Sequence, residues 1–222
     1  MYRPARAKLS KTGRAKFISH LDLYRTVSRA ITRSKIPVWY TEGFNPHPFV
    51  TFLLPLSLGI ESECEFMDYK IDDSMTFDDA GMLLSEALPE GLEVTDVYEP
   101  VMKAKDIASA RYTMEMRFEG KTGDETAKIV REIAGRSEIF VQKRSKSGEK
   151  TVNLKEIARL EQAEFEVLKD NAVMSITLPA GNAENVNPQL ISGAFEKEFA
   201  QDFSYLKITR KAVYNGSGEM FV

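Results

Sequence analysis

Residues 19–37 read SHLDLYRTVSRAITRSKIP, and this stretch carries the clearest helix pattern in the chain. Ser19 is a preferred N-cap residue, and Asp22 three positions later completes a capping-box pattern. One apolar face follows at helical spacing and consists of Leu23, Val27, Ala30 and Ile31. Pro37 ends the helix, because the residue before a proline is pushed out of the α region.

Strand and helix patterns alternate on both sides of this helix. Residues 5–9 precede it as a strand, and residues 38–40 and 49–54 follow as two extended runs around a loop. Residues 63–71 alternate as a strand, with Met67, Tyr69 and Ile71 on one face. Thr76 opens a second helix over 77–88, and residues 92–98 form a last strand. The order β-α-β-β-α-β predicts a ferredoxin-like sandwich.

The second half repeats this order with additional hairpin length. A strand over 110–118 precedes a helix over 124–134, and two strands flank a turn at 145–148. A hairpin over 165–178, a helix opened by Asn187-Pro188 and a strand over 207–214 complete it. The sequence predicts an α+β protein of two tandem ferredoxin-like (βαββαβ) sandwiches. We expect the first domain over residues 1–102 and the second over 103–222.

Composition excludes several classes of protein. The chain has 222 residues, of which 43% are apolar and 28% charged, as in ordinary soluble proteins. It contains no run of 18 apolar residues, and no apolar segment follows the basic start, so we expect neither a membrane span nor a secretory signal. The single cysteine, Cys64, excludes an internal disulfide and a cluster held by cysteines. We expect a cytoplasmic protein without a cofactor.

The net charge of −3 conceals a strong asymmetry along the chain. Residues 1–36 hold ten Lys or Arg and one acid, a net charge of +9. Residues 37–110 carry −12, and the remainder is balanced. Such a distribution indicates an anionic partner at the basic end.

Six basic side chains are candidates for contact with phosphate groups. On the first helix, Arg25, Arg29 and Arg33 are four residues apart and therefore share one face. The segment before that helix adds Lys11, Arg14 and Lys16. Arginine suits phosphate because its planar fork binds two oxygens at once. The alternative is a solvated helix face that pairs with the acidic middle segment.

The two histidines of the chain, His20 and His47, lie in the same half as these basic residues. His47 stands between Pro46 and Pro48, whose fixed φ angles stiffen the loop that carries it. Contact with phosphate or a base, metal ligation and acid–base catalysis are all open to a histidine. Metal-ligand spacing is missing, so no metal site is predicted. Asn45 in the same loop is a further candidate for substrate contact.

Aromatic residues flank the loop that carries His47. Tyr40 and Phe44, if exposed, would stack on bases of single-stranded RNA. Trp39 is expected in the core. The chain lacks phosphate-loop, dinucleotide-binding and nucleophile-elbow motifs. Nucleotide hydrolysis, dinucleotide binding and α/β-hydrolase chemistry therefore have no support in the sequence.

Two stretches resemble one bacterial family, the radical-SAM-linked domain of unknown function. They are KTGRAKFISHLDL (residues 11–23), continued by Arg25, Arg29 and Ala30, and EGFNPHP (residues 42–48), continued by Pro55-Leu56 and Gly59. Members of that family stand alone or lie at the C-terminal end of a radical SAM protein of the cobalamin-binding type. This chain lacks the C-x-x-x-C-x-x-C motif, so the resemblance implies an accessory partner of a radical SAM protein. A looser similarity, based on topology, is to tandem ferredoxin-like RNA endonucleases that process CRISPR repeats.

Three functions remain open at this point. The first is a non-catalytic module that binds RNA or another anionic substrate for a radical SAM enzyme, and the six basic side chains with His20, Asn45 and His47 form its substrate site. The second is a metal-independent RNA endonuclease that uses His20 or His47 as its acid or base. The third is a module that docks on the radical SAM protein through its charged segments. None of the three requires a membrane.

Overall fold

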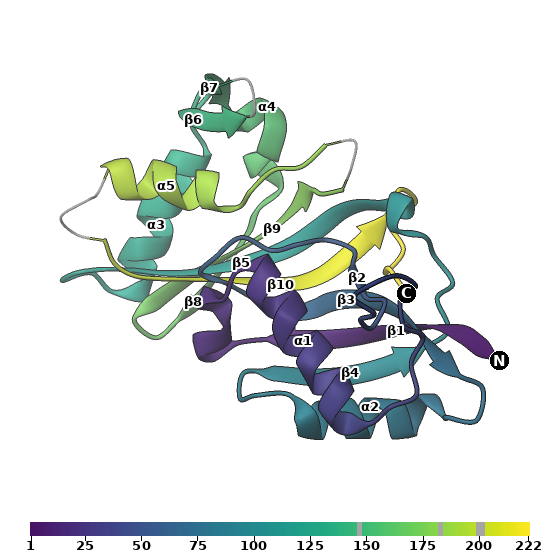
Figure 1. Cartoon of the computed structure of the whole chain (residues 1–222). Helices are drawn as coiled ribbons and strands as arrows, with labels where there is room; N and C mark the ends of the chain where they lie inside the picture. Colours follow the sequence, from purple (N-terminus) through teal and green to yellow (C-terminus); the bar gives the residue numbers. More distant parts are fainter. Residues whose placement is uncertain (146–147, 182–183, 199–202) are drawn as a thin grey trace. The chain divides into compact units, whose positions relative to one another are not determined.

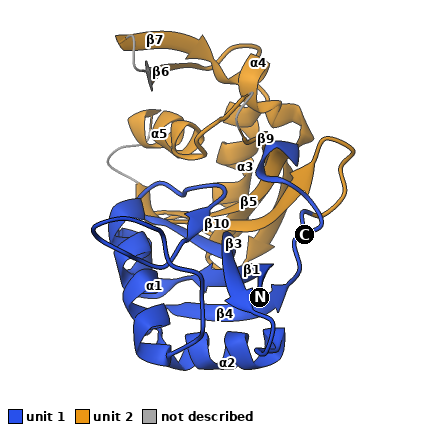
Figure 2. Cartoon of the chain, turned by 45° about the vertical axis from the view of Figure 1, so that its right-hand side comes forward, with its two compact units in different colours: residues 1–106, 221–222 blue, residues 107–220 orange. Residues whose placement is uncertain are grey.

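The computed structural model describes residues 1–145, 148–181, 184–198 and 203–222, and they form an α+β fold (Figure 1). These residues divide into two compact units (Figure 2). Unit 1 contains residues 1–106 together with 221–222, and unit 2 contains residues 107–220. No helix in the described ranges is long and apolar enough to cross a membrane.

Unit 1 contains four strands that pair antiparallel. Its strands are β1 (Tyr2–Lys11), β2 (Thr51–Phe52), β3 (Ile60–Asp72) and β4 (Leu92–Tyr98). β1 lies between β3 and β4, and β2 pairs with the other side of β3. The register places Ala5 opposite Tyr69 and Ala7 opposite Met67. Small residues on β1 thus leave room for the large side chains of β3 beneath the helices.

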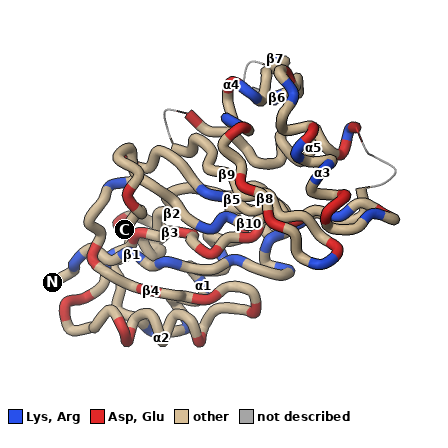
Figure 3. The backbone as a smooth tube through the Cα atoms, turned by 180° about the vertical axis from the view of Figure 1, so that it is seen from behind, with Lys and Arg blue, Asp and Glu red and all other residues tan. Residues whose placement is uncertain are grey.

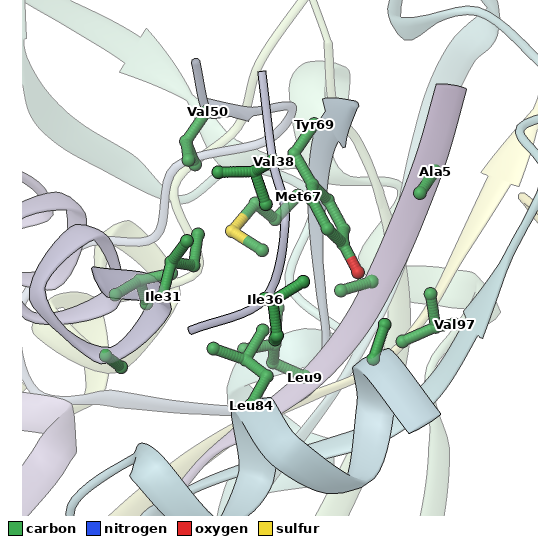
Figure 4. Packing of buried hydrophobic residues seen from close by; sticks show 14 of the residues in the cluster. Ala5, Leu9, Ile31, Ile36, Val38, Val50, Met67, Tyr69, Leu84 and Val97 are labelled. Carbon is green, nitrogen blue, oxygen red and sulfur yellow. The ribbon is translucent and has the colours of Figure 1, made fainter. Parts of the chain in front are cut away.

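Two α-helices and two short 3-10 helices complete the described part of unit 1. They are η1 (Gly13–Phe17), α1 (His20–Ser34), α2 (Phe77–Ala87) and η2 (Ala104–Asp106). The predicted cap of α1 is confirmed, because the backbone N–H of Asp22 donates to the Ser19 hydroxyl at 3.1 Å. The predicted apolar face is confirmed as well, and all four of its residues are buried. It packs on the face of β3 that carries Met67, Tyr69 and Ile71 (Figure 4).

The prediction of two extended runs around the loop after α1 was largely wrong. Residues 38–40 make only isolated bridges, from Val38 to Ile71 and from Tyr40 to Pro48. Of residues 49–54, only β2 is a strand. Pro46 and Pro48 have no N–H, so a regular ladder across this loop has too few donors. The loop is instead closed by backbone bonds, from Thr41 N to His47 O (2.9 Å) and from Phe49 N to Trp39 O (3.1 Å).

In unit 2 four strands pair antiparallel in the order β10-β5-β9-β8. These strands are β5 (Ile107–Phe118), β8 (Glu164–Leu168), β9 (Asn171–Pro179) and β10 (Phe203–Asn215). The helix α3 (Gly123–Ala134) packs against β5, β8 and β9, whereas α5 (Gln189–Glu198) contacts β6 (Phe140–Ser145). The predicted hairpin over 165–178 is confirmed as β8–β9. The additional hairpin forms a separate two-stranded sheet of β6 (Phe140–Ser145) and β7 (Gly148–Asn153), whose turn residues 146–147 lie outside the described residues. Short helices that we did not predict follow it: α4 (Leu154–Ala158) and η3 (Leu160–Gln162).

Candidate functional site

The arginine face of α1 and the loop that carries His47 line one open depression of about 500 Å³ in unit 1. From α1 it is lined by Ser28, Arg29, Thr32 and Arg33, and from the loop by Tyr40, Pro46, His47 and Pro48. We call it the α1–loop depression. It brings together two segments that the sequence analysis selected separately, the helix arginines and the EGFNPHP loop.

The three arginines of α1 have the same spacing but different surroundings. Arg25 pairs with Asp22 at 3.6 Å on the exposed surface and does not line the depression. Arg33 lines it and also donates to the carbonyl of Ala87 at 2.7 Å, which ties α1 to the end of α2. Arg29 lines it and makes no hydrogen bond or ion pair within the described part of the chain. Arg29 is therefore the guanidinium best placed to bind an external anion.

Hydrogen bonds inside the loop fix the imidazole of His47. Its Nδ1 lies 3.0 Å from the carbonyl oxygen of Asn45 and 3.1 Å from the hydroxyl of Thr41. Its backbone N–H donates to the same hydroxyl at 3.2 Å. A carbonyl oxygen only accepts, so Nδ1 carries a proton in this arrangement. The neutral ring then has its lone pair on Nε2, and the protonated ring has an N–H donor there.

Aromatic side chains around the loop differ in exposure. Phe44 at the loop tip is fully exposed, and Tyr40, which lines the depression, is 40% exposed. Trp39 was expected in the core but is only half-buried. Its ring packs edge-on against Phe49 at 5.3 Å, and the Nζ of Lys70 lies 5.0 Å from the ring centre. Two aromatic rings are thus available to a ligand at this end of unit 1.

The other predicted site residues lie outside the lining of the depression. Lys11 is only 1% exposed at the end of β1, which leaves no surface for a phosphate, so we withdraw it as a phosphate ligand. Lys16 is largely buried and pairs with Glu61 at 3.3 Å, so its charge is already balanced. Arg14 is exposed on η1. His20 is exposed at the start of α1, with its ring edge-on to Phe52 at 5.7 Å.

Asn45 contributes to the site mainly through its backbone, because its carbonyl oxygen accepts from the His47 ring. Sequence reasoning missed Ser28 and Thr32, although they flank Arg29 on the same helix face and Thr32 donates to the Ser28 carbonyl at 3.0 Å. Their spacing of four residues was the available signal. Thr41, which positions His47, gave no signal in the sequence, because its role depends on how the loop closes.

Within the described ranges, no group of three His, Cys, Asp or Glu side chains is arranged to hold a metal ion. The lone cysteine, Cys64, is buried. The chemistry that the depression offers is therefore that of two guanidinium groups, an imidazole, a phenol ring and an apolar wall of prolines.

Comparisons with known proteins give a family but no activity. None of the curated proteins compared with the chain matches its sequence. One solved structure, of an unknown protein from Galdieria sulphuraria, matches over 100% of both chains at 14% identity, with a TM-score of 0.27 that carries no argument about fold or function. A family model, described as an uncharacterized protein conserved in bacteria (DUF2344), matches residues 5–188. The chain, including both segments of the α1–loop depression, therefore belongs to the bacterial family DUF2344.

Proposed function

We propose that this protein is an accessory module that binds RNA, or another anionic substrate, for a radical SAM enzyme. The observation that carries the proposal is the α1–loop depression, where Arg29 and Arg33 of α1 meet His47 and Tyr40 of the loop. Each phosphate that a protein neutralises releases counterions, which gives binding energy to a site of this kind.

The charge of the site supports an anionic ligand. Arg29 has no acidic partner within the described part of the chain, and Arg33 is held by a neutral carbonyl. Two basic side chains of unit 1 outside the depression have acidic partners, in the pairs Lys16–Glu61 and Arg6–Asp68. On α1, Arg25 is paired with Asp22, so the basic charge that remains available on this helix lies at the depression.

The radical SAM partner is inferred from the sequence resemblance. Reductive cleavage of S-adenosylmethionine needs an iron–sulfur cluster with cysteine ligands, and this chain has one cysteine. A partner protein would supply that chemistry. The carboxylates of α2 and β4 form an acidic region of unit 1 (Figure 3) and give that partner a surface to dock on, as the docking function requires.

An RNA endonuclease has less support from the geometry. Acid–base cleavage needs a proton acceptor and a proton donor at one phosphodiester. His47 lines the depression, whereas His20 does not, and no carboxylate lines it. Binding alone requires only the groups that are present.

We also propose that both units are ferredoxin-like sandwiches. In unit 1 the strand order is β4-β1-β3-β2, and in unit 2 it is β10-β5-β9-β8. If the β6–β7 hairpin and the short helices after it are treated as an insertion, the two orders correspond strand for strand, with one helix after the first strand and one before the last.

A binding titration tests the proposed function. Fluorescence anisotropy with labelled tRNA and rRNA fragments, at two salt concentrations, is expected to show binding that weakens as salt rises. Arg29→Ala is expected to reduce the salt slope, d log K/d log[salt], by about 0.7 if one phosphate contact on a single strand is lost. Arg25→Ala is the matched control, since Arg25 is exposed on the same helix but outside the depression.

Three results would count against these assignments. Absence of binding to any RNA would refute the proposed function. Equal loss in both arginine variants would refute the assignment to the depression. Cleavage of the RNA by the wild type, abolished in His47→Ala, would show that the endonuclease function is correct instead.

A further inference from the structure

We propose that the α1–loop depression is a subsite for a single unpaired ribonucleotide within an RNA strand. This inference rests on the proposed function and specifies its ligand. It follows from three features of the depression: its size, the different elements that supply its arginines and its apolar groups, and the hydrogen bonds that orient the His47 ring.

The size of the depression is sufficient for a nucleotide. Its volume of about 500 Å³ lies within the range of small-ligand sites, about 300–1,000 Å³. The walls come from one helix and one loop, and the depression is open, so part of a ligand can enter it from the solvent. A paired base cannot enter such a site, because its ring faces and Watson–Crick edge are occupied within the duplex.

The arginines and the apolar groups of the depression come from different elements. Arg29 and Arg33 belong to α1, whereas Tyr40, Pro46 and Pro48 belong to the loop. A phosphate on the helix side would bind the unpaired guanidinium of Arg29 and the remaining N–H groups of Arg33. The base would then lie against the Tyr40 ring and the prolines, as bases stack on aromatic side chains in single-stranded RNA sites.

The loop tip extends this surface beyond the depression. Phe44 is fully exposed four residues from Tyr40, and the loop between them and His47 is closed by the Thr41–His47 backbone bond of 2.9 Å. Stacking on aromatic rings does not depend on base identity, because every base has a π face. We therefore infer little sequence preference, with the neighbouring base on Phe44.

His47 is suited to recognise the ribose. With Nδ1 donating to the Asn45 carbonyl, the neutral ring presents a lone pair at Nε2. A hydroxyl group donates to such a lone pair, and the 2′-hydroxyl is the group that distinguishes RNA from DNA. The Thr41 hydroxyl contacts ring Nδ1 at 3.1 Å and accepts from the His47 backbone N–H at 3.2 Å, so the ring is oriented before the ligand arrives.

Four labelled ligands test the inference with the full chain. They are a single-stranded RNA, a single-stranded DNA and an RNA duplex of the same sequence, and a free ribonucleoside monophosphate. We expect the single-stranded RNA to bind at least about tenfold more tightly than the other three. The free nucleotide distinguishes a site for a small metabolite from a site for an RNA strand.

Two variants assign the base and the ribose, and Arg29→Ala, described above, assigns the phosphate. Tyr40→Ala is expected to weaken single-stranded RNA about tenfold, which is the lower part of the range for one lost base stack. Phe17→Ala is its control, since Phe17 is 65% exposed outside the depression. His47→Ala should reduce the RNA-to-DNA affinity ratio towards one, whereas His20→Ala should leave it unchanged. Tyr40→Leu repeats the first test with an apolar wall if Tyr40→Ala fails to fold.

The outcomes separate this inference from the proposed function. Equal affinity for duplex and single strand, still reduced by Arg29→Ala, would overturn the unpaired nucleotide and leave RNA binding intact. An RNA-to-DNA ratio unaffected by His47→Ala would overturn recognition of the ribose. Binding of the free nucleotide as tight as that of the oligonucleotide would overturn the RNA strand as the ligand. Absence of binding to all four ligands would refute both proposals.

Discussion

The removal of Asp68 is expected to destabilise unit 1 strongly, because it leaves a buried cation without its counter-charge. The Arg6 side chain is 1% exposed. Its Nε and one terminal nitrogen donate to the two Asp68 carboxylate oxygens at 2.7 and 2.9 Å. Its other terminal nitrogen donates to the Val222 carbonyl at 2.9 Å, and the guanidinium lies 4.7 Å from the centre of the Phe221 ring.

The expected loss of stability depends on how deeply each side chain of this ion pair is buried. Loss of one partner from a buried ion pair destabilises a protein by about 3–5 kcal/mol. Asp68 is 31% exposed and Arg6 keeps the Val222 carbonyl, so we place Asp68→Ala at the lower end, about 3 kcal/mol. Arg6→Met removes the buried charge and leaves a carboxylate that water can reach, so we expect a loss of about 1 kcal/mol.

Urea denaturation followed by tryptophan fluorescence measures this difference within unit 1. Trp39 is the single tryptophan of the chain and lies in unit 1. The double variant Arg6→Met with Asp68→Ala is expected to recover most of the stability that Asp68→Ala loses. A loss below about 1 kcal/mol for Asp68→Ala, or a double variant no more stable than it, would refute the reasoning.

Three further predictions concern single residues. The Tyr69 hydroxyl is buried without a hydrogen-bond partner in the described ranges, and burial raises its pKa, so Tyr69→Phe should raise the free energy of unfolding by about 1 kcal/mol in the same urea assay. Hydrogen bonds from the backbone N–H and hydroxyl of Thr122 lower the pKa of Glu125, so its contribution exists above the ordinary pKa of 4.5 and is lost as the pH falls through the lowered value. Glu125→Ala should therefore reduce stability at pH 7 and approach the wild type in acid, as measured by far-UV circular dichroism during denaturation. Gly91 has φ +86°, and an added Cβ would lie 2.6 Å from the Thr12 carbonyl oxygen. Gly91→Ala should therefore destabilise unit 1 by about 2 kcal/mol. The control Gly13→Ala, at φ +57° with no atom near the added Cβ, should destabilise it by about 1 kcal/mol.

The helices and long strands of unit 1 could be predicted from the sequence, because residues close together in the chain determine them. The Ser19 cap depends only on the first turn of α1, and the apolar face depends only on the spacing of residues along that helix. Both are present in the structure. The alternation of Met67, Tyr69 and Ile71 likewise determines which face of β3 packs with the helix core, although Cys64 and Phe66 on the other face are buried as well. The short helices α4 and η3 were missed, because five and three residues are too few to show a period.

The candidate site was predicted only in part, because neighbours distant in sequence decide what a charged side chain does. Arg25, Arg29 and Arg33 are indistinguishable by spacing, yet Asp22 pairs with the first and the Ala87 carbonyl holds the third. The Ala87 carbonyl is 54 residues from Arg33 and gives no sign of this contact in the sequence. The burial of Lys11 also depends on tertiary structure, because a lysine at the end of a strand is ordinarily exposed.

The failed strand prediction and the existence of the site have the same cause. Val38 bridges to Ile71 and Trp39 N donates to the Lys70 carbonyl, which fixes the start of the loop on β3. Prolines at 46 and 48 lack the donors for a second regular strand, so the chain turns back and closes on itself between Tyr40 and Pro48. A regular strand at 46–48 would have placed alternate side chains on opposite faces. The closed loop instead brings Tyr40, Pro46, His47 and Pro48 to one depression that Arg29 also lines. Substitution of the two prolines would therefore be expected to disturb the site before it disturbs the core, because Ile71 and the rest of β3 stay paired with β1.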